Sequence, residues 1–171
     1  MKKLLVIIDC QKDFVSGSLG FDGADKIMDN IVKKAESFDG DIAFTMDTHS
    51  SEYKDTREGK NLPVIHCQKG TEGWQIVDKL QKFTENAVVF EKQTFGSYDF
   101  LEFLKKSQYD QITLTGVVTN ICVISNAVMA LTALPYAEII VDAACVGGGD
   151  DVTAQKALDV MESIHIKVIN R

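Results

Sequence analysis

The sequence predicts an α/β protein, a three-layer α/β/α sandwich built on a largely parallel six-stranded sheet. Two observations predict this fold. Short apolar runs rich in Val, Ile and Leu recur six times along the chain, and segments with helical spacing of apolar residues lie between them. Apolar runs without polar alternation are typical of strands buried on both faces of a parallel sheet. Regular alternation of strands and helices favours parallel strands joined by right-handed crossovers.

The predicted strands are short and follow one another along the whole chain: Leu4–Ile8, Asp41–Thr45, Ala87–Phe90, Gln111–Gly116, Ala137–Val141 and Ile166–Ile169. The predicted helices between them are amphipathic or apolar: Ala24–Phe38, Gly73–Phe83, Tyr98–Lys105, Asn120–Leu134 and Asp151–Ser163. No internal repeat or linker interrupts this order, so the chain is expected to form one domain over residues 1–171. The fourth predicted helix is apolar nearly all round, which indicates burial within one subunit or packing against a second copy in a homo-oligomer.

The composition excludes several classes of function. With 18 Lys and Arg against 25 Asp and Glu, the net charge of −7 argues against a protein that grips nucleic acid. No apolar run approaches the ~20 residues that span a membrane. The apolar run Leu4–Ile8 is too short for a secretory signal, so a cytoplasmic location is expected. The four cysteines form no Cys-x-x-Cys pair, which excludes a zinc knuckle and a thioredoxin motif. In the reducing compartment expected here, each is a free thiol that is either a nucleophile or a core residue.

Reactive side chains follow four of the predicted strands. Asp9 ends the first strand, Asp47 and His49 follow the second, Lys92 follows the third, and Cys122 follows the fourth. Ligands of open parallel α/β sheets bind beyond the carboxyl ends of the strands. We therefore expect these groups to meet at one edge of the sheet.

Cys122 stands at the expected start of a helix, where backbone N–H groups lower the pKa of a thiol and can hold a developing oxyanion. Asp9 closes an apolar strand, where partial desolvation raises the pKa of a carboxyl group towards the range of a general base. Lys92 would hold this carboxylate and favour the thiolate if it faces both groups. The structural alternatives are a small core residue for Cys122, a turn or cap for Asp9 and a solvated charge for Lys92.

These residues together resemble the isochorismatase-like cysteine hydrolases. The resemblance lies in Asp9 with Gln11 and Phe14 after it, in Lys92, and in the segment Gly116-Val117-Val118-Thr119-Asn120-Ile121-Cys122. It covers almost the whole chain in the same order, and it implies the Rossmann-like sandwich of that family.

The resemblance also implies roles for individual residues. Asp9, Lys92 and Cys122 match the catalytic triad of the family, with the cysteine as nucleophile. A cis peptide is expected between Val117 and Val118. The backbone N–H groups of Val118 and Cys122 are then expected to form the oxyanion hole.

A second set of residues resembles the nicotinamidase branch of the family, whose members bind a divalent metal. Asp47, His49 and His66 would supply one carboxylate and two imidazoles, and the resemblance implies zinc, with manganese or iron as alternatives. Many nicotinamidases have a further histidine after Asp-x-His, and this chain has none there. Glu58 is expected to take its place, and Glu52 and Asp55 are the alternatives.

The resemblance implies an amidohydrolase of NAD salvage that converts nicotinamide to nicotinate and ammonia through a thioester. Phe14 and Phe95 would form the walls of a pocket for the aromatic ring, and the alternative is that they are core residues, the usual place of aromatic side chains. Two alternatives stay open. Relatives with the same triad act on carbamoyl, ureido or vinyl-ether substrates, and some isochorismatase-like domains are non-catalytic modules. The expected partner is a small amide substrate, and binding to nucleic acid or to a membrane is not expected.

Overall fold

Six parallel strands form one sheet in the order β3-β2-β1-β4-β5-β6. The structure, a computed structural model, describes residues 1–171. The strands are β1 Lys3–Ile8, β2 Asp41–Asp47, β3 Val88–Lys92, β4 Gln111–Val117, β5 Glu138–Gly147 and β6 Lys167–Ile169. The predicted sandwich on a parallel sheet is confirmed, and no helix is long and apolar enough to span a membrane.

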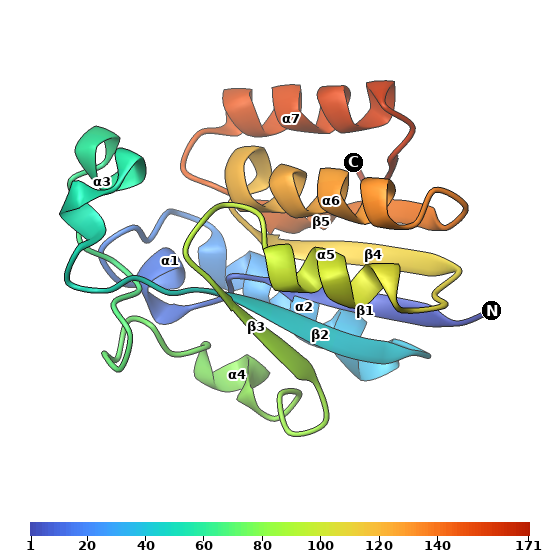
Figure 1. Ribbon diagram of the computed structural model, residues 1–171, viewed down its shortest axis with the longest axis horizontal. Coiled ribbons are helices and arrows are strands. Elements are labelled where there is room, and N and C mark those ends of the chain that lie inside the picture. Colours follow the sequence, from blue (N-terminus) through green and yellow to red (C-terminus); the bar gives the residue numbers. More distant parts are fainter.

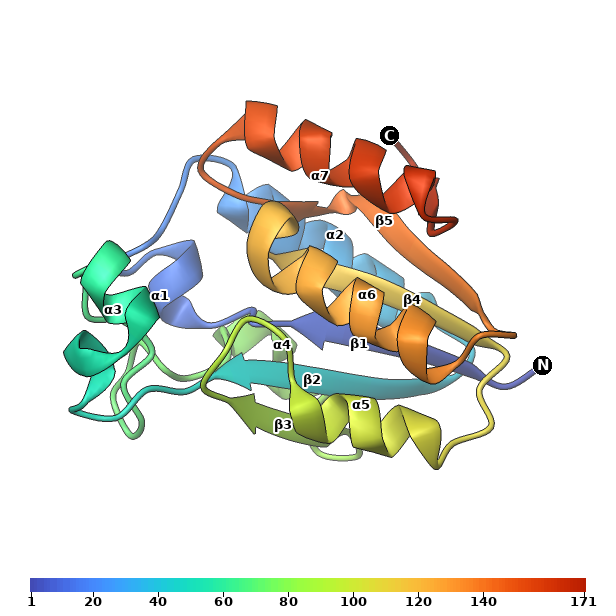
Figure 2. The same ribbon diagram turned by 45° about the horizontal axis from the view of Figure 1, so that its top comes forward.

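Helices cover both faces of this sheet (Figures 1 and 2). Residues of α5, α6 and α7 pack on one face, and residues of α1, α2 and α4 pack on the other. The helices are α1 Lys12–Val15, α2 Ala24–Ser37, α3 Arg57–Asn61, α4 Asp78–Gln81, α5 Tyr98–Lys105, α6 Ile124–Ala133 and α7 Asp151–Ser163. A 3₁₀ turn, η1 (Tyr53–Asp55), precedes α3, and a π-helical turn, η2 (Thr119–Val123), precedes α6.

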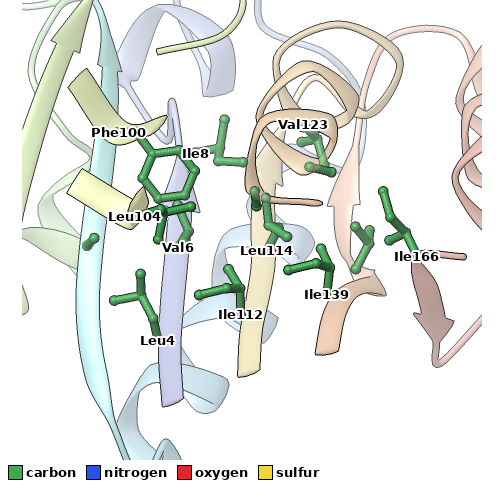
Figure 3. Packing of buried hydrophobic residues seen from close by; sticks show 14 of the residues in the cluster. Leu4, Val6, Ile8, Phe100, Leu104, Ile112, Leu114, Val123, Ile139 and Ile166 are labelled. Atoms are coloured by element: carbon green, nitrogen blue, oxygen red, sulfur yellow. The ribbon is translucent and has the colours of Figure 1, made fainter. Parts of the chain in front are cut away.

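Alternation along β1 explains why both faces are apolar. Leu4, Val6 and Ile8 belong to the core beneath α5 and α6, as Figure 3 shows. Leu5 and Ile7 belong to the opposite core beneath α2. Successive side chains of a strand point to opposite faces, so a strand buried on both sides must be apolar at every position.

The prediction of a helix over Gly73–Phe83 is wrong for most of that range, because only Asp78–Gln81 is helical. The backbone before it pairs with the segment that follows β1. Val77 N donates to Cys10 O, and Lys12 N donates to Gln75 O. The apolar residues of this segment have helical spacing. However, the backbone groups of Gln75 and Val77 bond to the segment after β1, so they are not available for hydrogen bonds within a helix.

The carboxyl ends of β2, β3 and β4 extend beyond the predicted ranges, and those of β2 and β3 carry reactive residues. β2 ends at Asp47 and β3 at Lys92, and these two residues are register partners. β4 continues through Gly116, whose φ is 112° and where a Cβ atom would lie 2.0 Å from the carbonyl oxygen of Ile8. Only glycine fits this close approach of β4 to β1.

Candidate active site and metal centre

Asp9, Lys92 and Cys122 lie together at the carboxyl ends of β1, β3 and β4. The Nζ atom of Lys92 lies 2.7 Å from Oδ2 of Asp9 and 3.6 Å from Sγ of Cys122. All three residues are buried, with relative exposures of 0%, 5% and 5% for Asp9, Lys92 and Cys122. The lysine thus bridges the carboxylate and the sulfur.

The position of Asp9 is fixed by its neighbour β2. Its backbone N–H donates to the carbonyl of Thr45, and the Thr45 hydroxyl donates to Asp9 Oδ1 over 2.7 Å. Asp9 has a φ of 48°, so the chain turns sharply where β1 ends. This hydrogen bonding leaves the other carboxylate oxygen for Lys92.

The protonation of these groups follows from their burial. Burial raises the pKa of Asp9 above its ordinary value, and the charge of Lys92 opposes this rise. Burial raises the pKa of the Cys122 thiol well above its ordinary value, and the charge of Asp9 raises it further. Burial acts to lower the pKa of Lys92, but Asp9, Cys122 and Asp47 together outweigh that effect, raise the pKa and keep the ammonium charged. The expectation of a thiol pKa lowered by the helix is therefore wrong for the free protein.

The turn that carries Cys122 is formed by η2. The peptide bond between Val117 and Val118 is cis, as expected. The Val118 carbonyl accepts hydrogen bonds from the N–H groups of Ile121 and Val123. The Val118 N–H donates to no backbone carbonyl. Val118 and Cys122 line the same cavity. The Val118 N–H is therefore a backbone donor without a backbone partner in a residue that lines the same cavity as Cys122.

A second cluster brings together Asp47, His49, Glu58 and His66, with one ligand atom from each residue lying within 4.8 Å of the others. Oδ2 of Asp47 lies 2.8 Å from His49 Nε2 and 3.3 Å from His66 Nε2. Oε1 of Glu58 lies 3.9 Å and 3.6 Å from the same two nitrogens. The four predicted metal ligands therefore converge.

The donor set of this cluster fits a divalent metal. Two imidazole nitrogens and two carboxylate oxygens suit zinc and comparable ions. Nδ1 of His66 lies 2.8 Å from the carbonyl oxygen of Val64, an outer contact that leaves Nε2 for the centre. Burial acts to lower the pKa of His66, but the Asp47 and Glu58 carboxylates raise it to about 10. The two carboxylates thus stabilise positive charge at the imidazole of His66.

The local fold decides between the three candidate acids. Thr56 caps α3 by accepting a hydrogen bond from Gly59 N over 2.9 Å, and this cap places Glu58 in the first turn of α3. Glu52 and Asp55 are exposed and lie outside the cluster. The structure therefore favours Glu58, as expected.

One cavity of about 750 Å³ connects the two clusters. Asp47, Glu58 and His66 of the metal cluster and Cys122 of the triad all line it. The predicted pocket residues Phe14 and Phe95 line it as well, and the Phe14 ring stands edge-on to His66 at 5.5 Å. Lys92 also links the two clusters, because its Nζ lies 3.4 Å from Asp47 Oδ1.

Sequence reasoning missed the residues that support this centre. The Tyr53 ring lies 4.5 Å from that of His49 and 5.1 Å from that of His66, measured between centroids. Trp74 donates from Nε1 to the Thr48 hydroxyl. Neither residue has a local sequence signal, because Tyr53 is brought to the centre by the short 3₁₀ turn η1 and Trp74 by a loop.

Gln11, which follows Asp9 in the sequence motif, holds the backbone around Asp47 in place. Its side-chain amide is fully buried and donates to the carbonyls of Asp47 and Trp74 over 2.8 and 2.7 Å. Its Oε1 accepts the Asp47 N–H over 2.8 Å. The amide thereby fixes the backbone of a candidate metal ligand.

Replacing Gln11 with alanine is expected to weaken metal binding about 10–100-fold, the usual effect of removing a supporting contact of a metal ligand. It should also lower the free energy of unfolding by about 1–3 kcal/mol, because buried backbone groups lose their partners. Competition with a chelating dye measures the first effect and urea denaturation the second. The exposed Gln155→Ala variant is the control, and unchanged metal affinity in Gln11→Ala would contradict this role.

Comparison with known proteins agrees with this arrangement. The family model of the isochorismatase domain matches residues 3–171. An uncharacterised isochorismatase family protein, PncA of Bacillus subtilis (strain 168), is 30% identical over 145 residues, which cover 76% of this chain and 79% of the relative.

Two solved structures extend the comparison. The pyrazinamidase of Pyrococcus horikoshii in complex with zinc superposes with a TM-score of 0.85 at 25% identity, covering 100% of both chains. The nicotinamidase PncA of Bacillus subtilis gives a TM-score of 0.85 at 27% identity, covering 98% of this chain and 99% of the other. The chain is a hydrolase and belongs to the isochorismatase family.

Proposed function

We propose that this hydrolase is a nicotinamidase, which releases ammonia from nicotinamide through a thioester on Cys122. The enzyme acts on the carbon–nitrogen bond of amides, the reaction class of the nicotinamidase and pyrazinamidase relatives. One observation carries the proposal. Lys92 contacts Asp9, Cys122 and Asp47, so a buried thiol, an acid and a candidate metal ligand meet beneath one cavity.

In the first half of the proposed reaction, the Cys122 thiol gives its proton to the Asp9 carboxylate. The sulfur attacks the amide carbon, and the N–H groups of Val118 and Cys122 stabilise the oxyanion that forms. The C–N bond then breaks, and Asp9 delivers its proton to the nitrogen, which leaves as ammonia. The raised pKa of Asp9 supports its role as the base, because a carboxylate with an increased proton affinity accepts a proton more readily.

In the second half, water attacks the thioester and gives its proton to Asp9. The C–S bond breaks, nicotinic acid leaves, and the sulfur regains a proton from Asp9. Lys92 stays charged throughout and holds the carboxylate and the sulfur within reach of each other.

Asp47, His49, Glu58 and His66 would hold the metal, and zinc is the ion that this donor set and the zinc-bound relative favour. A divalent ion there supplies a Lewis acid that can accept the ring nitrogen of the substrate. Phe14 and Phe95 would then contact the faces or edges of the ring.

The test is ammonia and nicotinate release from nicotinamide by the metal-loaded protein, with carbamoyl, ureido and vinyl-ether compounds assayed in parallel. The proposal expects the highest kcat/KM for nicotinamide. Faster turnover of any other class with no release from nicotinamide would replace the substrate and keep the triad. No turnover of any compound, with metal bound, would support a non-catalytic module.

A further inference from the structure

The wall of the cavity formed by α3 carries a cation that the proposed reaction does not use. Arg57 is the only lysine or arginine that lines the cavity. It lies on α3 next to Glu58, while Cys122 lies in η2 before α6. Figures 1 and 2 both show α3 well apart from the start of α6, so the cavity extends from the nucleophile towards α3.

The guanidinium of Arg57 is free. This side chain forms no hydrogen bond or ion pair within the chain, and the Asn61 side chain donates a hydrogen bond to the backbone carbonyl of Arg57. The other arginine, Arg171, contacts Asp159 and Glu162. Arg57 is an exposed residue that lines the cavity, so its guanidinium is accessible to a ligand.

The acidic groups of the cavity do not satisfy Arg57. The two carboxylates that line the cavity are Asp47 and Glu58, and both face the histidines of the metal cluster. The remaining polar side chains around Arg57 and across the cavity are neutral: Thr56, Asn61, Gln93 and Thr94. Arg57 is therefore the unmatched charge of this cavity.

We infer that Arg57 binds an acidic group of the substrate, a carboxylate or a phosphate monoester, remote from the amide that Cys122 attacks. A guanidinium binds either group through two parallel hydrogen bonds. The cavity of about 750 Å³ is in the range of pockets for drug-sized ligands and leaves room for a substituent beyond a single ring. This inference rests on the proposed amide hydrolysis and extends its substrates from nicotinamide to pyridine carboxamides that also carry such an acidic group.

The test compares matched pairs of amides on the metal-loaded enzyme. The first pair is the monoamide of a pyridinedicarboxylic acid and its neutral methyl ester. The second pair is a pyridine carboxamide with a phosphomethyl group and the corresponding alcohol. Each is assayed with wild type, Arg57→Gln and the control Lys54→Gln, which removes an exposed charge outside the cavity.

Wild type is expected to favour one acidic amide over its neutral partner about 10–100-fold in kcat/KM, the value of a hydrogen bond to a charged group. Arg57→Gln should abolish this preference, and Lys54→Gln should keep it. The pair with the larger Arg57-dependent preference identifies the acidic group. Equal kcat/KM for both members of both pairs, or equal losses in the two variants, would overturn the inference.

Calorimetry on Cys122→Ala separates this inference from the proposed reaction, because binding needs no turnover. If the acidic amides bind this variant more weakly after Arg57→Gln and no amide is hydrolysed by wild type, the reaction fails and the anion site stands. If nicotinamide is hydrolysed but acidity improves neither binding nor turnover, the anion site fails and the reaction stands.

Discussion

Cys122→Ala is expected to lower kcat for amide hydrolysis by about 10⁴-fold or more, the scale seen when a covalent nucleophile is removed. The thiol is the only sulfur in contact with Lys92, and it lines the cavity. Alanine keeps the apolar contacts of this buried position, so the fold should persist. Ammonia release measures the first effect, and circular dichroism with thermal denaturation measures the second.

Cys145→Ala is the matched control, because Cys145 is also a buried thiol but lies in the core beneath α2 and does not line the cavity. It should retain turnover close to that of wild type. Near-normal turnover in Cys122→Ala would refute the thioester mechanism.

Lys92→Met is expected to remove activity and to lower the free energy of unfolding by about 3–5 kcal/mol, the usual cost of breaking a buried ion pair from one side. Lys92 is the ammonium that pairs with Asp9 and Asp47, and both acids are buried. Methionine has a similar length without the charge, so two neighbouring carboxylates would lose their cation. Urea denaturation of the metal-free protein measures the stability, and ammonia release measures the activity.

The control for this variant is Lys82→Met, which breaks an ion pair with Glu36 between side chains that are 58% and 52% exposed. Exposed pairs contribute at most about 1 kcal/mol. Similar losses of stability in the two lysine variants would show that the Lys92 ammonium does not stabilise the fold through its buried ion pairs with Asp9 and Asp47.

The strand ends could be predicted because burial on both faces forces a long apolar run, and the first polar residue then marks where the strand leaves the core. Asp9 is such a residue, and Lys92 and Asp47 lie just beyond the runs that predicted β3 and β2. The parallel sheet then brings these ends to one edge, which is why the predicted residues meet.

The remaining features depend on contacts between distant segments. The prediction of a helix over Gly73–Phe83 is wrong because the backbone of Gln75 and Val77 forms hydrogen bonds with the segment that follows β1. The pKa of Cys122 was predicted in the wrong direction because burial and the neighbouring Asp9 raise it. Similarly, the choice of Glu58 became clear only from the cap at Thr56 and the position of α3.

The most direct test of a metal-assisted nicotinamidase is ammonia release from nicotinamide before chelation, after chelation and after add-back of single divalent ions. We predict that chelation abolishes turnover, that zinc, manganese or iron restores it, and that Glu58→Gln needs a higher metal concentration for the same rate. Full turnover by protein shown to be free of metal would contradict the role assigned to Asp47, His49, Glu58 and His66.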